Sequence, residues 1–177
     1  MNGPEKPPRR VTVMGSGSWG TAFALVLADA GNEVILWARR PELAAAINAE
    51  HRNPDYFPTI ELPGSVRALS DPAAAMAGAE FVVLAVPSQS LRGNLTGWSL
   101  PADAVVVSLA KGIELGSGLR MSEVIADAGS VDPERIAVVT GPNLAREIAE
   151  RQPSASVVAS VSPDTAEALQ RTCHTAR

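Results

Sequence analysis

A glycine-rich segment between a short apolar run and an alanine-rich stretch constrains the fold of this chain more than any other feature. Residues 11–22 read Val-Thr-Val-Met-Gly-Ser-Gly-Ser-Trp-Gly-Thr-Ala, with a Gly-x-Gly-x-x-Gly pattern at Gly15, Gly17 and Gly20. Between a strand and a helix, this pattern is typical of a turn that binds the diphosphate of a dinucleotide. Gly15 permits the tight turn, Gly17 lets the backbone approach the diphosphate, and Gly20 lets the helix pack closely on the strand. The alternative is an ordinary glycine-rich turn, but both flanking patterns favour the nucleotide site.

The start of the following helix adds an electrostatic reason to expect phosphates here. The helix begins near Ser18, so its free N–H groups and the positive end of its dipole point toward the glycine-rich turn. Trp19 lies inside the turn, where its ring is positioned to pack along a bound dinucleotide. The candidate cofactor-binding residues of this segment are therefore Gly15, Gly17, Ser18, Trp19 and Gly20.

The second predicted strand indicates which dinucleotide is bound. Residues 33–37 read as a buried strand, and Arg39 and Arg40 follow its carboxyl end. Sites for NAD carry an acidic residue there, whereas an arginine accommodates the 2′-phosphate of NADP with a planar fork of hydrogen-bond donors. Glu33 lies at the opposite end of the strand. We therefore predict NADP(H), with NAD(H) also bound, and favour Arg39 over Arg40 as the phosphate ligand; the alternative for either arginine is a solvated surface charge.

Composition argues against several other classes of protein. The chain has 177 residues, of which 46% are hydrophobic and 19% charged, as is ordinary for a globular α/β domain. Its net charge of −4 argues against nucleic acid as a partner, because such surfaces are usually basic. No apolar run approaches the roughly 20 residues that span a bilayer. Residues 1–9 are polar and proline-rich, so we expect a disordered lead-in to a domain over residues 10–177, without a signal peptide.

Cysteine and histidine are scarce in this chain. The single Cys173 excludes an intrachain disulfide, and two histidines with one cysteine argue against a Cys/His metal site. We therefore expect a cytoplasmic protein that binds no metal.

Strand and helix patterns alternate along the chain. This order predicts an α/β fold, namely a Rossmann-like, doubly wound, mostly parallel sheet with helices on both faces. Residues 51–64, rich in asparagine and proline, are expected to form a loop. The predicted strands cover residues 10–14, 33–37, 65–69, 80–86, 104–110, 135–140 and 154–160. The predicted helices cover residues 18–30, 42–50, 118–128, 144–150 and 163–174, with a short one after Asp71-Pro72.

Polar residues gather at the predicted carboxyl ends of the strands, where ligands bind in open α/β sheets. Lys111 follows an apolar strand and precedes a glycine, so its ammonium is placed to hold a substrate phosphate or polarise a carbonyl. A lysine that simply carries its charge to water is the alternative. The turn Gly141-Pro-Asn143 offers backbone N–H groups to an anion, although Asn143 also suits a helix cap.

A general acid or base is missing from this set. His51 lies in a polar loop and His174 lies near the end of the chain, so neither is a convincing proton donor. We therefore expect no catalytic residue within this chain. A binding module that senses NADPH without chemistry remains an alternative function.

Six segments together resemble the bacterial NAD(P)-dependent glycerol-3-phosphate dehydrogenases. They occur in that family's order and spacing between Val11 and Ala149. As an ordered set they are highly specific, above all Lys-Gly-Ile-Glu followed about thirty residues later by Gly-Pro-Asn-Leu-Ala. The segments are Gly15–Ala22, Leu36–Pro41, Asn53–Pro58, Ala85–Ser88, Leu109–Glu114 and Gly141–Ala149.

The resemblance implies reduction of dihydroxyacetone phosphate to sn-glycerol 3-phosphate by NAD(P)H, which feeds glycerophospholipid synthesis. Carried over by position, Ser18, Trp19, Arg39 and Ala145 would contact the dinucleotide. Lys111 would touch both cofactor and substrate, and Gly141 and Asn143 would touch the substrate. A related 3-hydroxyacid or 6-phosphogluconate-type dehydrogenase is a rival, against which the Lys111 and Gly141 segments argue.

The end of the chain departs from the family pattern. Family members continue into a helical C-terminal domain that supplies the catalytic lysine, and nothing up to Arg177 matches that domain. The resemblance therefore implies that the substrate domain is missing here and that the catalytic lysine lies beyond residue 177. We expect little turnover from this chain alone, and a possible homodimer for the full-length enzyme.

Overall fold

The structure is a computed structural model that describes residues 7–175, so most of the predicted lead-in at residues 1–9 lies outside the described residues. Arg9 is described: its backbone N–H donates to Asn32 and its guanidinium pairs with Glu80. The strands are β1 (Arg10–Met14), β2 (Glu33–Trp37), β3 (Val66–Leu69), β4 (Phe81–Leu84), β5 (Val105–Ser108), β6 (Ile136–Thr140) and β7 (Val157–Ser160). The α-helices are α1 (Ser18–Asp29), α2 (Pro41–Glu50), α3 (Pro72–Met76), α4 (Leu91–Leu95), α5 (Met121–Gly129), α6 (Ala145–Ala149) and α7 (Pro163–Cys173).

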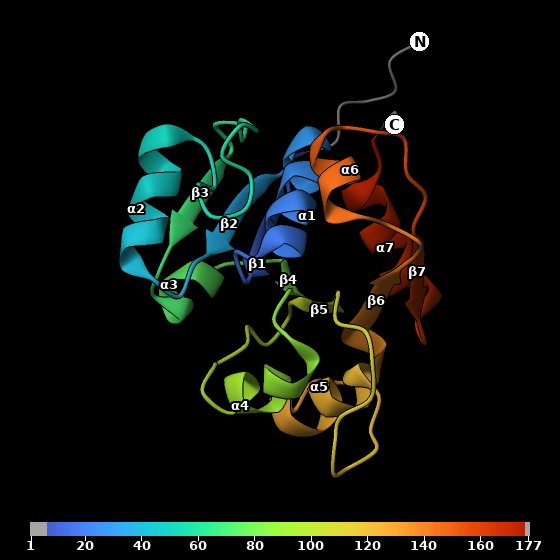
Figure 1. The fold of residues 1–177 in the computed structure, drawn as a ribbon. Coiled ribbons are helices and arrows are strands. Elements are labelled where there is room, and N and C mark those ends of the chain that lie inside the picture. The colour runs from blue at the N-terminus through green and yellow to red at the C-terminus, as the bar shows by residue number, and fades with distance from the viewer. Residues whose placement is uncertain (1–6, 176–177) are drawn as a thin grey trace.

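The strands of the described chain form one sheet in the order β3-β2-β1-β4-β5-β6-β7. Strands β1 to β6 are parallel, and β7 runs antiparallel to β6. The strand order reverses between β1 and β4, because the chain builds outward first to β3 and then, from β4, in the other direction (Figure 1). Ligands of doubly wound sheets bind at this switch point.

Helices cover both faces of the sheet (Figure 1). Helices α1, α2, α6 and α7 contribute to one apolar cluster, and α3, α4 and α5 contribute to a second. Successive strand residues point to opposite faces, so Val11 and Val13 join the first cluster and Met14 joins the second. The central strand β4 is buried along its whole length, as expected for a parallel strand covered on both sides.

The predicted fold class is confirmed, and most predicted elements are present. Asp71 caps α3 as expected, its carboxylate accepting a hydrogen bond from the Ala74 N–H at 2.6 Å. The helix predicted over residues 118–128 begins only at Met121, because Gly118 lies in the left-handed region with φ +72° and closes a turn before the helix. The predicted strand 154–160 is ordered as a strand only over Val157–Ser160, and its antiparallel direction is not evident from the sequence pattern.

Within residues 7–175, none of the helices combines the length and apolar character that a membrane span requires.

Candidate functional site

A cleft of about 1030 Å³ opens at the carboxyl ends of β1, β2, β4 and β5. Its position follows from the strand order, since the glycine-rich turn after β1 meets the segment after β4 at the switch point. The residues that line it after β1 are Gly15, Ser16, Gly17, Ser18 and Trp19; those after the other strands include Trp37, Arg39, Tyr56, Ala85, Pro87, Gln89, Asn94, Leu109 and Ala110.

The three glycines of the turn meet different surroundings. At Gly15, where φ is +131°, a Cβ would lie 2.6 Å from the carbonyl oxygen of Ala85. At Gly20 a Cβ would lie 1.9 Å from the carbonyl oxygen of Gly15, so α1 packs here as closely as backbones can. A Cβ at Gly17 would meet no atom within 4 Å. Gly15 and Gly20 therefore maintain the turn, and Gly17 leaves space open in front of it.

Helix α1 begins at Ser18 with Gly17 at its cap position, and the Thr21 N–H donates to the Gly17 carbonyl at 2.9 Å. Its first turn contains no acidic residue, so its positive end is not neutralised by its own side chains. Trp19 is half-buried, with its ring centroid 6.4 Å from that of Phe23. This start of α1 suits an anion in the cleft.

Arg39 and Arg40 are adjacent in sequence and differ in surroundings. Arg39 is exposed and lines the cleft. Arg40 is absent from the cleft lining; its guanidinium pairs with Asp55 and lies 3.8 Å from a carboxylate oxygen of Glu42. The two guanidiniums therefore differ in access to a ligand phosphate.

The second group of predicted residues lies beyond Ala110 at the edge of the cleft. Lys111 is exposed, and its Nζ donates to the carbonyl oxygen of Gly141 at 3.0 Å. The Asn143 amide donates to the hydroxyl of Ser156 at 2.6 Å, and Leu144 rather than Asn143 occupies the cap position of α6. The helix-cap alternative for Asn143 is therefore wrong. The fold thus brings residues 111 and 141–143 together. Neither these residues nor Ala145, at the start of α6, are among the residues that line the cleft.

A network of polar side chains supports the loop that carries Lys111. Gln89 pairs its amide with the backbone of that loop, donating to the Ile113 carbonyl and accepting from the Leu115 N–H, both at 2.9 Å. The nearly buried Glu114 accepts hydrogen bonds from Arg92 at 3.0 Å, and these bonds lower the pKa of the Glu114 carboxyl. Helix α4 and the segment before it thus hold the Lys111 loop.

Tyr56 and Asn94 also line the cleft, and sequence reasoning did not select them. The signal for Tyr56 was present, since it belongs to the Asn53–Pro58 segment of the family resemblance. Asn94 lies in the short helix α4, where no motif distinguishes it from a surface asparagine. His51, by contrast, is exposed at the end of α2 and is not among the cleft residues.

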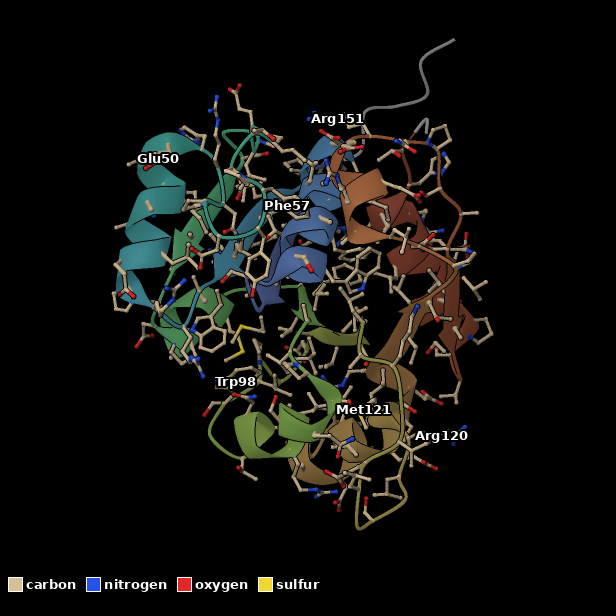
Figure 2. All side chains as sticks on the ribbon, viewed as in Figure 1. Glu50, Phe57, Trp98, Arg120, Met121 and Arg151 are labelled. Carbon is tan, nitrogen blue, oxygen red and sulfur yellow. The ribbon has the colours of Figure 1, made fainter. Side chains whose placement is uncertain are left out.

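A second hollow, of about 870 Å³, lies among α1, α6, β7 and α7. Trp19 lines both hollows. Arg151, which Figure 2 labels, lines this second hollow. Its guanidinium pairs with Asp29 of α1 at 3.0 Å.

The doubly wound sheet, the tight glycine turn and the cleft at the switch point define a dinucleotide-binding domain of the Rossmann type. Residues 10–166 match the family model described as the N-terminus of NAD-dependent glycerol-3-phosphate dehydrogenase. The chain belongs to this family. The 3-hydroxyacid or 6-phosphogluconate-type rival is thereby set aside.

Relatives and solved structures agree with this assignment. The chain is 60% identical over 170 residues to glycerol-3-phosphate dehydrogenase [NAD(P)+] of Streptomyces avermitilis, with 95% of this chain and 51% of the relative covered. It matches the crystal structure of glycerol-3-phosphate dehydrogenase from Coxiella burnetii with a TM-score of 0.88 and 32% identity, covering 96% of this chain and 52% of that one. The corresponding enzyme of Saccharomyces cerevisiae gives a TM-score of 0.85 at 26% identity, covering 96% and 54%. The chain spans about half the length of the relatives it matches.

Proposed function

We propose that this chain is the dinucleotide-binding part of an oxidoreductase that interconverts dihydroxyacetone phosphate and sn-glycerol 3-phosphate with NAD(P)H. One observation carries the proposal: a member of this family presents its glycine turn to a cleft at the switch point of the sheet. The names of its relatives support both the reaction and the choice of cofactors. The product would feed glycerophospholipid synthesis, as the family resemblance implies.

The cofactor would sit across the carboxyl ends of β1 and β2. The diphosphate would occupy the open space in front of Gly17, against the start of α1 at Ser18 and Trp19. Arg39 would bind the 2′-phosphate, which favours NADP(H) over NAD(H). Arg40 would contribute its charge while paired to Asp55. Gly15 and Gly20 would act through the shape of the turn, and Ala145 would approach the cofactor from the start of α6.

The substrate would bind beside Lys111, Gly141 and Asn143. A bound reduced cofactor supplies the hydride for carbonyl reduction. The ammonium of Lys111 would hold the substrate phosphate or stabilise the charge that develops on the carbonyl oxygen. The residue that donates the proton would lie outside this chain, as the family resemblance implies, so we expect little turnover from residues 1–177 alone.

Location and assembly are part of the same proposal. The single cysteine supports a cytoplasmic protein, and the family resemblance suggests a homodimer for the full-length enzyme. Light scattering on the full-length form tests the assembly, and a monomeric mass would overturn that part.

Two measurements test the function. The 177-residue chain is titrated into NADPH while the nicotinamide fluorescence is followed, and saturable binding is expected. The chain is then joined to the C-terminal half of the Streptomyces avermitilis relative, and oxidation of NADPH is followed with dihydroxyacetone phosphate. Turnover by the chimera with little turnover by the chain alone supports the proposal. NADPH binding without turnover by the folded chimera would instead favour a sensing module.

A further inference from the structure

Asn53 is a completely buried polar residue that no role described above explains. It lies in the loop between α2 and β3 with none of its surface exposed. Its amide nitrogen donates to the Ser16 carbonyl at 2.9 Å and to the Thr21 hydroxyl at 2.8 Å. Both partners belong to the glycine-rich turn and the first turn of α1. The loop is thus bound to the turn more than 30 residues away in sequence.

The same asparagine also shapes its own loop. Its side-chain oxygen accepts from the Asp55 N–H at 3.2 Å, and its carbonyl accepts from the Phe57 N–H at 2.8 Å. Phe57 is buried and belongs to the apolar cluster around α1, beside which it lies in Figure 2. The tight turn between Asn53 and Phe57 carries Tyr56, which lines the cleft. One side chain therefore connects two walls of the cleft.

The bond to Ser16 has a geometric consequence for the cleft. Because a trans peptide is planar, its C=O and N–H groups point in opposite directions, and no cis peptide occurs among residues 7–175. The Ser16 carbonyl points toward Asn53, so the N–H of Gly17 in the same peptide points away from Asn53. Ser16 and Gly17 line the cleft, and Asn53 is not among the lining residues. Thr21 reinforces this orientation, since its hydroxyl also donates to the Ser16 carbonyl, at 3.3 Å.

We infer that Asn53 is a positioning residue for cofactor binding: it holds the peptide between Ser16 and Gly17 so that an N–H faces the cofactor diphosphate. The inference deepens the proposed function and rests on it. A buried amide suits this task because it supplies two donors without charge, and an unsatisfied carbonyl here would be costly. Without Asn53 the turn still closes, through Gly15 and Gly20, but the Ser16 carbonyl keeps only the longer hydrogen bond from the Thr21 hydroxyl, so this peptide is less firmly held.

Asn32 offers a matched control at the other end of α1. It is also buried, donates its amide to the carbonyls of Leu27 and Thr172 at 2.8 Å, and accepts from the Arg9 N–H. Replacing Asn32 or Asn53 by alanine removes two donated hydrogen bonds and one accepted hydrogen bond in each case. Only Asn53 contacts the glycine turn. The two variants therefore separate general destabilisation from positioning.

The experiment measures dissociation constants of the folded 177-residue chain and its melting temperature. NADPH is compared with adenosine 2′-monophosphate, which lacks the diphosphate, by fluorescence and NMR titration respectively. For Asn53→Ala we expect weaker NADPH binding by about tenfold, the equivalent of one lost hydrogen bond, and a change of less than about twofold for adenosine 2′-monophosphate. Asn32→Ala should lower the melting temperature similarly and leave both constants near wild type.

A second variant keeps the test decisive if Asn53→Ala fails to fold. Thr21→Val preserves the buried volume and removes the hydroxyl that bonds both Asn53 and Ser16, so NADPH binding should weaken by about threefold. Equal NADPH affinity in the wild type and in every folded variant at Asn53 and Thr21 would overturn the inference and leave the proposed function intact. Equal weakening of both ligands, or an equal effect of Asn32→Ala, would also overturn it. Failure of the wild-type chain to bind NADPH would overturn both.

Discussion

The two ends of the cleft are built from different parts of the polypeptide. At the end formed by β1, buried backbone and small residues make the surface. Gly20 packs against Gly15, and the buried Asn53 donates a hydrogen bond to the Ser16 carbonyl of the turn. At the edge beyond the cleft lining, the loops that follow β5 and β6 carry the exposed Lys111 and the half-buried Gly141 and Asn143. Large apolar side chains are also exposed there, with Leu115 82% and Leu144 62% accessible.

The contrast indicates which kind of substitution should disrupt each end of the site. A turn made of closely packed backbone tolerates no added atom at Gly15 or Gly20, because a Cβ there would overlap a carbonyl oxygen, and it depends little on charge. A surface made of long side chains on loops tolerates added atoms, but it depends on ion pairs such as Arg92–Glu114 to hold the loop in place. Substitutions should therefore affect folding at the first end and chemistry or pH response at the second.

The largest effect is expected for Gly20→Ala. Its Cβ would lie 1.9 Å from the Gly15 carbonyl oxygen, so α1 must move away from β1, and we expect the free energy of unfolding to fall by about 3 kcal/mol or more. Urea denaturation measures this change. Gly17→Ala is the control, since a Cβ there meets nothing and its cost should stay within about 1 kcal/mol. Equal stabilities of the two variants would contradict the packing argument.

At the opposite end, Lys111→Gln should leave folding intact and impair chemistry. In the chimera described above, we expect kcat/KM for dihydroxyacetone phosphate to fall by about 100-fold, because the ammonium would no longer neutralise charge on the substrate. The melting temperature should change little, since Lys111 is exposed and makes one hydrogen bond, to Gly141. Arg120→Gln, which removes an exposed cation from the same loop region, serves as the control. An undiminished rate in the Lys111 variant would remove this residue from the site.

A smaller and more selective effect is expected for Arg39→Ala. Loss of a charge-assisted hydrogen bond to the 2′-phosphate should weaken NADPH binding by about tenfold while leaving NADH within about twofold. Arg40→Ala should weaken NADPH binding less than Arg39→Ala does, and should change NADH binding little, because the Arg40 guanidinium is paired with Asp55. Titrations of both cofactors decide the matter, and an unchanged preference for NADPH would show that Arg39 is only a surface charge.

The smallest expected effect is on the stability of the folded chain at acidic pH. Arg120 lowers the pKa of the Glu123 carboxyl from 4.5 to about 2, and Arg92 lowers that of Glu114. Because both pKa values are lower in the folded chain, these carboxylates stabilise it above pH 4.5, and for Glu123 this contribution is lost as the pH falls toward 2. The melting temperature of the Glu114→Gln, Glu123→Gln double variant should therefore depend less on pH between 4.5 and 2.

Glu167→Gln is the control for this experiment, since it removes an exposed ion pair with Arg171 on α7, far along the chain from the Lys111 loop. Identical pH profiles for the wild type and the double variant would show that the two ion pairs contribute nothing to stability.

Sequence reasoning succeeded where a residue's role depends on its immediate neighbours. The glycine turn, the strands beside it and the Asp71 cap were all predicted, because local spacing determines each of them. It was less reliable at the boundaries of the later elements. The start of α5 at Met121 depends on a turn at Gly118, and the direction of β7 depends on how the chain returns to the sheet.

The candidate site shows the same division. The motifs were sufficient to select Gly15, Gly17, Arg39 and Lys111 from their positions along the chain. They favoured Arg39 over Arg40 as the phosphate ligand, but they did not reveal the ion pair of Arg40, because Asp55 approaches from a separate loop. Nor did they reveal Asn53, whose partners lie more than 30 residues earlier in the chain.

Short stretches of the sequence determined the turns and the apolar periodicities of this protein, because backbone sterics and side-chain alternation act over only a few positions. Short motifs also carried the resemblance to its family. The partners of polar side chains that lie far apart along the chain were decided by folding alone. Hydrogen bonds such as those from Asn53 to Ser16 and from Lys111 to Gly141 exist because the sheet order brings distant loops to one edge. The function of these polar groups depends on which other groups lie within hydrogen-bond distance in the folded chain, and their spacing along the sequence does not encode that distance.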